Sequence, residues 1–422
     1  MEIRPILASL RKHKLTATLL ALQVAFTCAI VCNAAFLIVQ RIERVTTPSG
    51  MVENTLSIVH IDDLGADANA LSLHQGDVAA LRQLPGVESA AIIDHVPFAN
   101  SMDSTGICGS LTAVHAAMKA RALVPGCTIA DEYAGGPGML GTLGLKLVAG
   151  RDFHADEYVP GKQGSGGHGV LTAVVITRAL ARRLFPHNPD HAIGRAVYFG
   201  AGMMHGQGTR IAGVIAQLHR ASIGKADTAW QSMLLPVEPG NNRVTFALRS
   251  KPADRVRVMK EALALLAKRK PNRQISADDA RTYTQIRATH FARDTTMVRL
   301  LLAAALGLLF VTALGIAGLA SFWVGQRTRS IGIRRAIGAT RRDILRYFQT
   351  ENFLIVSVGI VVGLALAIGL NLLLMDHYEL PRLPLAYLAV GAVALWILGQ
   401  LAVLHPAMRA ARVPPVAATR SA

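Results

Sequence analysis

Charged residues are scarce in this 422-residue chain, at 17% of the sequence, while hydrophobic residues reach 51%. An average soluble domain carries about 25% charged residues. The sequence also lacks low-complexity runs and internal repeats, which excludes a disordered, fibrous or solenoid chain. A chain this apolar and this poor in charge is expected to use lipid as the solvent for part of its length.

The motifs of common catalytic and metal sites are missing as well. The 14 histidines form no HExxH pattern, the four cysteines form no CxxC pair, and no Walker A motif occurs, even in the glycine-rich residues 155–170, which we interpret as a linker. The adjacent acids Asp131-Glu132 and Asp278-Asp279 cannot face one site together, and we expect them on the solvated surface. The sequence thus predicts no catalytic residue, no cofactor and no metal, and we do not expect an enzyme.

Four long runs contain no formal charge: residues 15–39, 300–325, 352–374 and 385–404. A helix needs about 20 apolar residues to cross the hydrocarbon core, and a central charge would cost about 2.5–3.5 kcal/mol. Four buried helices of a soluble protein would all have to hide inside one chain, so we interpret the runs as transmembrane helices. The first run exceeds the roughly 7–15-residue core of a signal peptide, which favours an uncleaved anchor.

The excess of positive charge indicates the orientation of these helices. Lys and Arg number 44 against 27 Asp and Glu, a net charge of +17. Most of the excess lies in residues 1–14, 326–350 and 405–422, which the positive-inside rule places in the cytoplasm. We call residues 326–350 the basic loop. The orientation of the helices in the membrane then explains most of the excess positive charge. We therefore do not expect nucleic acid as a partner.

Residues 40–297 remain as one large extracytoplasmic domain of mixed α and β structure. Alternating apolar patterns and turn signals predict its elements. The expected strands are residues 55–61, 87–93, 172–176, 209–216 and 243–248, and the expected helices are residues 77–84, 178–185 and 252–269. The predicted fold class is therefore an α-helical membrane protein with four transmembrane helices plus a large α+β extracytoplasmic domain between the first and second.

Cysteines and glycines leave two structural alternatives open. Cys108 and Cys127 lie in the domain expected outside, where they could form a disulfide or remain two buried thiols. Gly359 and Gly363 form a GxxxG pair in the third run, which permits either close helix packing or simple flexibility.

The basic loop has the pattern of two short helices. Residues 330–337 can form a helix that ends at Gly338, and Thr340 with Asp343 can cap the next one. The basic loop combines apolar residues with seven arginines. This composition is typical either of a loop in contact with lipid headgroups or of a docking element for a cytoplasmic partner.

Several stretches share the pattern of one family. Residues 327–340 read RTRSIGIRRAIGAT and continue through Asp343-Ile344 to Glu351. Other matching stretches are 143–153 (LGLKLVAGRDF), 175–186 (VITRALARRLFP) with Ile193-Gly194, 211–215 (IAGVI) and 406–415 (PAMRAARVPP). In order and over most of the chain, they resemble FtsX-domain permeases of the MacB type. The chain departs from the family at Pro414-Pro415 and in its short end Ala417-Ala418-Thr419, where relatives commonly have an Asp-Pro and a Glu-Ala-Leu pattern.

The resemblance implies a division of labour. Permeases of this family form dimers and work with a cytoplasmic ATPase of the ABC class, which in MacB is fused ahead of the first crossing. Here 14 residues precede that crossing, so a separate ATPase subunit is expected. The outer domain is expected to have a porter-like part and an inserted sabre-like part.

The function that the resemblance implies is that of a permease subunit in the bacterial inner membrane. Both termini would be cytoplasmic, and ATP hydrolysis would drive periplasmic movements for export or efflux. The alternatives are a lipoprotein-release permease and an FtsX-like signal relay that regulates a periplasmic partner. The expected partners are the ATPase, a second permease chain in a homo- or heterodimer, membrane lipid and, in an efflux system, a periplasmic adaptor. The expected docking residues for the ATPase are Arg327, Arg329, Ile333, Arg334, Arg335, Ile337, Gly338, Arg341, Arg342, Ile344, Phe348 and Glu351.

Overall fold

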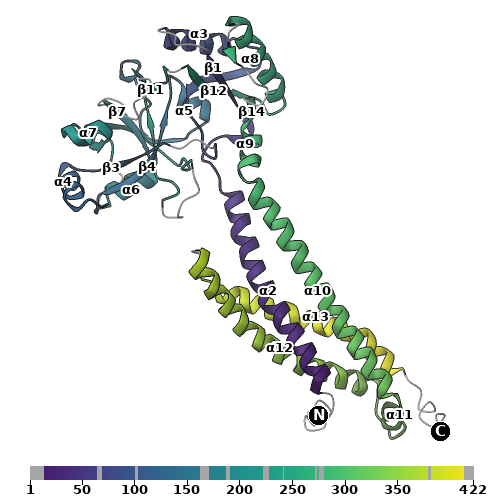
Figure 1. The fold of residues 1–422 in the computed structure, drawn as a ribbon. Helices are drawn as coiled ribbons and strands as arrows, with labels where there is room; N and C mark the ends of the chain where they lie inside the picture. The colour runs from purple at the N-terminus through teal and green to yellow at the C-terminus, as the bar shows by residue number, and fades with distance from the viewer. Residues whose placement is uncertain are drawn as a thin grey trace. The chain divides into compact units, whose positions relative to one another are not determined.

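The chain folds as two compact units in the computed structural model (Figure 1). A helical unit comprises residues 1–46 and 293–422, and an α+β unit comprises residues 47–292. The structure describes residues 14–63, 69–99, 103–161, 171–186, 191–221, 228–240, 242–270, 273–274, 280–378 and 382–412. Most of the glycine-rich stretch, the acids Asp278-Asp279 and the ends of the chain lie outside these residues.

The helical unit contains four helices that are long and apolar enough to cross a membrane, counted over the described residues. They are α2 (Lys14–Thr46), α10 (Ala292–Gln326), α12 (Arg341–Tyr378) and α13 (Leu385–Ala411). The predicted fold class is confirmed. Each helix extends past its charge-free run because polar flanks also favour helix, so the α+β unit is shorter than the expected residues 40–297.

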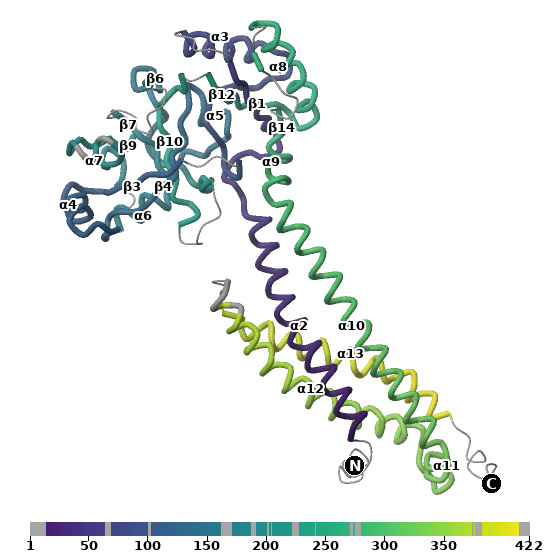
Figure 2. Tube along the Cα trace, in the orientation of Figure 1, coloured from purple at the N-terminus to yellow at the C-terminus, as the bar shows by residue number. Residues whose placement is uncertain are grey.

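The long helices pack through small residues and a few hydrogen bonds. Helices α2 and α12 lie side by side (Figures 1 and 2). The Asn33 side chain on α2 donates to the carbonyl of Ala367 on α12 at 3.1 Å. The hydroxyls of Thr27 and Thr312 join α2 to α10 at 2.7 Å. Such bonds satisfy polar groups that lipid cannot solvate.

The first sheet of the α+β unit has five strands in the order β13-β1-β12-β2, with β14 also pairing with β1. The strands are β1 (Leu56–Asp63), β2 (Val87–Ile93), β12 (Arg243–Ser250), β13 (Arg273–Gln274) and β14 (Ala280–Thr282). Helices α3 (Ala70–Arg82) and α8 (Arg255–Arg269) cover one face of it (Figure 1). Leu81 and Leu266 on these helices are fully buried against Phe246.

The second sheet has seven strands in the order β5-β9-β7-β10-β4-β3-β8, and it closes on itself because β8 also pairs with β9. Its strands are β3 (Ser104–Cys108), β4 (Cys127–Ala134), β5 (Leu147–Gly150), β7 (Ala173–Thr177), β8 (Ala196–Phe199), β9 (Thr209–Ile215) and β10 (Ser232–Leu235). Thr177 caps α6 (Arg178–Leu184), whose Leu180 and Leu184 enter the core of this sheet. The remaining elements are α4 (Leu111–Ala120), α5 (Met139–Leu143), α7 (Gly200–His205), α9 (Tyr283–His290) and the pair β6 (Val159–Pro160) with β11 (Val237–Glu238).

The expectation that Asp131 and Glu132 are solvated is wrong. Both lie on β4 in the interior of the second sheet and are buried, at 0% and 8% exposed. The Asp131 carboxylate accepts hydrogen bonds from Arg220 Nε at 2.7 Å and from the backbone of Ala221 at 2.8 Å. Partners 89 and 90 positions away in the chain thus compensate the desolvation of this charge.

Candidate functional site

The basic loop folds as a helix, a glycine turn and the start of α12. Helix α11 (Thr328–Ala336) ends before Gly338, whose φ of 106° is in the left-handed region that favours glycine. The Thr340 amide donates to Asp343 Oδ2 at 3.0 Å, and the Asp343 amide donates to Thr340 Oγ1 at 3.3 Å. This reciprocal pair caps α12, as the sequence predicted.

The inner face of the basic loop is packed within the chain. Ile331, Ile344 and Phe348 are each under 5% exposed. Their apolar neighbours belong to α10 and α13: Val324, Ala407, Ala410 and Ala411. Ile344 and Phe348, two of the expected docking residues, therefore hold the loop against its own helices.

Charged residues fasten the two ends of the loop. Arg327 Nη1 lies 2.9 Å from Glu351 Oε2, and the Glu351 side chain is 1% exposed. Arg335 Nη1 donates to the carbonyl of Ala411 at 3.3 Å. The Arg334 guanidinium lies over the Tyr347 ring, 5.0 Å from its centre, a favourable cation–π distance. These interactions fix α11 relative to α10, α12 and α13.

The outer face of the loop keeps two apolar residues exposed. Ile337 is 82% exposed and Ile333 is 48% exposed, one helical turn apart. Five arginines of the same loop are also exposed: Arg329, Arg334, Arg341, Arg342 and Arg346. Together with Gly338, these residues form what we call the outer face.

Sequence reasoning missed Ile331 and Tyr347, which complete the inner packing. Ile331 lies two positions before Ile333, about 200° around a helix, so its opposite direction could have been read from the helical spacing. The contact of Tyr347 with Arg334 bridges two helices across the turn, and helical spacing alone does not reveal it.

The alternatives for cysteine and glycine also have structural answers. Cys108 and Cys127 stand directly opposite each other on β3 and β4 and form a disulfide. Gly359 and Gly363 both face α2, where an added Cβ would lie 2.7 Å from the Ala21 carbonyl oxygen and 2.5 Å from Cys28 Cβ respectively. The glycines thus permit close approach of the two helices. In the described part of the chain, no group of three or more His, Cys, Asp or Glu residues could hold a metal ion.

Four candidate membrane helices with an α+β domain between the first and second define a multi-pass membrane protein. Residues 302–415 match the model for the FtsX-like permease C-terminal domain. MacB, a macrolide export ATP-binding/permease protein, is 27% identical over 286 residues in Chromobacterium violaceum and 27% over 375 residues in Rhodopseudomonas palustris. Residues 302–415 therefore form an FtsX-like permease domain, and the chain is similar to MacB over most of its length.

The matches cover different shares of the relatives. The two MacB alignments span 65% and 82% of this chain but only 40% and 52% of those proteins. PvdT of Pseudomonas entomophila, a pyoverdine export ATP-binding/permease protein, is 41% identical over 133 residues, which is 31% of this chain and 20% of PvdT. The periplasmic region of MacB from Actinobacillus actinomycetemcomitans aligns with a TM-score of 0.31 and 15% identity, covering 58% of this chain and 97% of that structure.

Proposed function

We propose that this chain is the non-catalytic permease subunit of an export system in the bacterial inner membrane. A separate cytoplasmic ABC ATPase supplies ATP hydrolysis and docks on the outer face of the basic loop. The names of the relatives support this assignment, since they are export proteins with an ATP-binding part. Export is preferred over lipoprotein release or signal relay because of those names.

The exposure of Ile337 is the observation that carries the docking proposal. The interior of the loop is already filled by Ile331, Ile344 and Phe348, so Ile337 has no packing role within the unit. An exposed apolar side chain in a loop with several exposed arginines has the composition of an interface centre, where an anchor enters a pocket and charges pair at the rim.

The mechanical route follows from chain continuity. Helix α11 connects α10 directly to α12, and the Arg327–Glu351 ion pair fastens both ends. Helix α10 begins at Ala292, the last residue of the α+β unit. A movement imposed on α11 by ATP-driven closure of the ATPase would therefore pass along α10 to the α+β unit, which we place in the periplasm. A second permease chain would complete a dimer, as the ABC architecture of the family implies.

The test compares two variants that change the charge of the loop equally. Ile337→Asp and Arg341→Gln each remove one positive unit of net charge, and both positions are exposed. If the loop served only lipid headgroups, both would act alike through summed charge. If it docks an ATPase, Ile337→Asp places a charge in a desolvated pocket and reduces ATPase recovery by about tenfold or more, against about twofold for Arg341→Gln.

The measurement is quantitative mass spectrometry of the ABC ATPase that co-purifies with the full chain from membranes of its own bacterium. Equal yields of permease from the two variants provide the control for folding. Wild-type recovery of the ATPase by the Ile337→Asp variant would refute the docking surface.

A further inference from the structure

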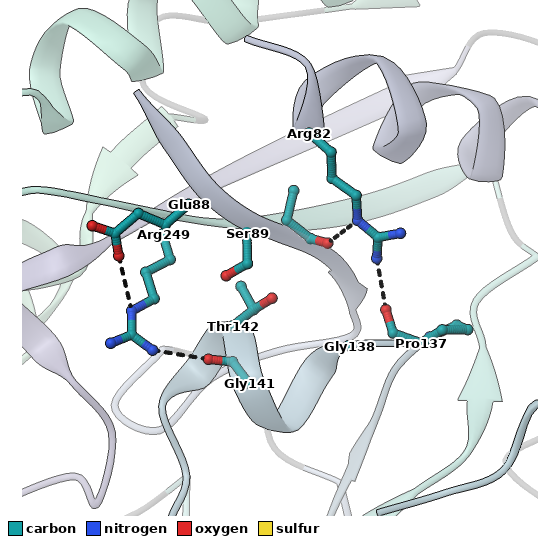
Figure 3. A pocket seen from close by; sticks show the side chains of 9 residues that line it. Arg82, Glu88, Ser89, Pro137, Gly138, Gly141, Thr142 and Arg249 are labelled. Atoms are coloured by element: carbon teal, nitrogen blue, oxygen red, sulfur yellow. Dashed lines mark hydrogen bonds and ion pairs between the residues drawn. The ribbon is translucent and has the colours of Figure 1, made fainter. Parts of the chain in front are cut away.

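An open groove of 670 Å³ lies in the α+β unit, between the five-stranded sheet and the α5 segment (Figure 3). One wall is formed by the start of β2 and the end of β12, which belong to the five-stranded sheet. The other wall is formed by residues 137–142, including part of α5, on the segment that joins β4 to β5 of the seven-stranded sheet. The volume is typical of small-molecule sites, and a ligand here would touch both the five-stranded sheet and the α5 segment.

Arg82 is held at one side of the groove by backbone groups (Figure 3). Its Nε donates to the carbonyl of Ala90 at 2.9 Å, and its Nη2 donates to the carbonyl of Pro137 at 2.8 Å. Both partners are neutral, so they orient the guanidinium without cancelling its charge.

Arg249 lies at the other side of the groove. Its Nη1 donates to the carbonyl of Gly141 at 3.0 Å, and its Nε lies 3.5 Å from Glu88 Oε2. Glu88 is the one acid among the described residues that line the groove. Arg82, Arg249 and Glu88 together carry a net charge of +1. Because Glu88 lies beside Arg249, the uncompensated positive charge is that of Arg82.

Two hydroxyl groups between the arginines have no hydrogen-bond partner among the described residues. They are Ser89 Oγ and Thr142 Oγ1, and Thr142 is fully buried. Figure 3 shows both side chains between the two guanidinium groups, on facing walls of the groove. Both oxygen atoms are closed off from solvent, so a ligand in the open groove contacts the walls around them and not the hydroxyls themselves.

We propose that this groove binds a small organic carboxylate. The carboxylate pairs with Arg82, since one negative charge matches the uncompensated positive charge of the site. The body of the ligand lies against the walls that β2 and α5 form. The bound molecule ties the α5 segment to the five-stranded sheet. The proposal does not depend on ATPase docking, because every residue in it belongs to the α+β unit.

The test measures binding of 4-hydroxybenzoate and its neutral isostere 4-hydroxybenzamide to the full chain in lipid nanodiscs, by calorimetric titration. The carboxylate should bind at least about tenfold more tightly than the amide, since a hydrogen bond to a charged group contributes about 1.5–3 kcal/mol. Equal affinity for the two probes, or no binding of either at millimolar concentration, would overturn the proposal.

Three variants locate the binding. Arg82→Gln should weaken the carboxylate by about tenfold and leave the amide unchanged. Arg243→Gln is the control, because Arg243 belongs to the same unit but pairs with Asp62 at the surface and does not line the groove. Thr142→Val keeps the side-chain volume and removes the unpartnered hydroxyl. It is a second control, because that hydroxyl is not accessible from the groove: binding of the carboxylate should not change, and the thermal unfolding temperature should stay the same or rise. Unchanged binding in Arg82→Gln would place the carboxylate elsewhere.

Discussion

Arg327 and Glu351 connect the beginning of the basic loop to the body of α12, with Nη1 and Oε2 2.9 Å apart. Twenty-four positions separate the two residues, and α11 lies entirely between them. Glu351 is buried, so its carboxylate pairs with this guanidinium instead of with water. The pair therefore sets the geometry from which α11 presents Ile337.

Replacing Arg327 by Met should lower the free energy of unfolding by about 3 kcal/mol, because it leaves the buried charge of Glu351 without its ion-pair partner. The matched control is Arg329→Met, which removes an exposed arginine two positions away and should change stability by less than about 0.5 kcal/mol. Denaturant unfolding of the full chain in detergent micelles measures both. Equal effects of the two variants would show that the buried ion pair contributes no more to the free energy of unfolding than an exposed arginine does.

The approach of α12 to α2 depends on Gly363. A Cβ at this position would lie 2.5 Å from Cys28 Cβ, whereas a Cβ at Gly369 on the same helix meets nothing within 4 Å. Gly363→Leu should therefore separate the helices and destabilise the unit by about 1–3 kcal/mol or more. Gly369→Leu should be nearly neutral. Thermal unfolding of both variants in the same lipid distinguishes packing from flexibility, and two neutral variants would support flexibility.

Glu132 gives the α+β unit a predictable response to pH. Burial raises the pKa of Glu132 from 4.5 to about 7, and the nearby carboxylates of Asp103 and Asp94 add to the increase. The folded state then holds a proton between pH 4.5 and about pH 7 that the unfolded chain releases. The free energy of unfolding therefore falls as pH rises through this window, and Glu132 causes no further loss above it.

Glu132→Gln cannot ionise and should remove this dependence. The variant should be more stable than wild type by about 2–3 kcal/mol at about pH 8 and nearly equal to it at about pH 4. Pulse proteolysis in urea, applied to the full chain across pH, measures the difference. Glu261→Gln, which changes a partly exposed acid on α8, is the control for replacing a glutamate at the surface. A pH-independent difference for Glu132→Gln would mean that Glu132 titrates normally.

The membrane helices and the capping of the basic loop were predictable because their causes are local. Twenty uncharged residues specify a crossing whatever the rest of the chain does, and Thr340 and Asp343 are only three positions apart. Strand β2 was predicted with its observed limits for the same reason, since alternation and a Pro85-Gly86 turn are contained in one segment.

Burial decided by distant partners was not predictable. Asp131 and Glu132 have the composition of a surface pair, and only the position of β4 inside a closed sheet, with Arg220 beside it, makes them interior. The apolar spacing of Ile344 and Phe348 predicted that this face of α12 is covered. It did not show which residues cover it. Their neighbours on α13 come about 60 positions later, so we limit the proposed docking surface to Ile333, Ile337 and the exposed arginines.

The sidedness of the membrane can be tested with few changes, because the wild-type thiols are protected. Cys28 and Cys32 are buried in α2, and Cys108 and Cys127 are joined. A membrane-impermeant maleimide should therefore react weakly with the unmodified chain. Single cysteines can then be introduced at Ser330 on α11 and Lys260 on α8, both of which are exposed.

We expect Lys260→Cys to react in intact spheroplasts and Ser330→Cys to react only after the membrane is opened. The reason is electrostatic: the seven arginines of the basic loop favour the cytoplasmic side during insertion, whereas the α+β unit carries no comparable bias. Labelling of both variants after detergent treatment provides the control for accessibility. Labelling of Ser330→Cys in intact spheroplasts would contradict the orientation and, with it, docking of a cytoplasmic ATPase at Ile337, whereas binding of a carboxylate in the groove beside Arg82 would remain possible on either side of the membrane.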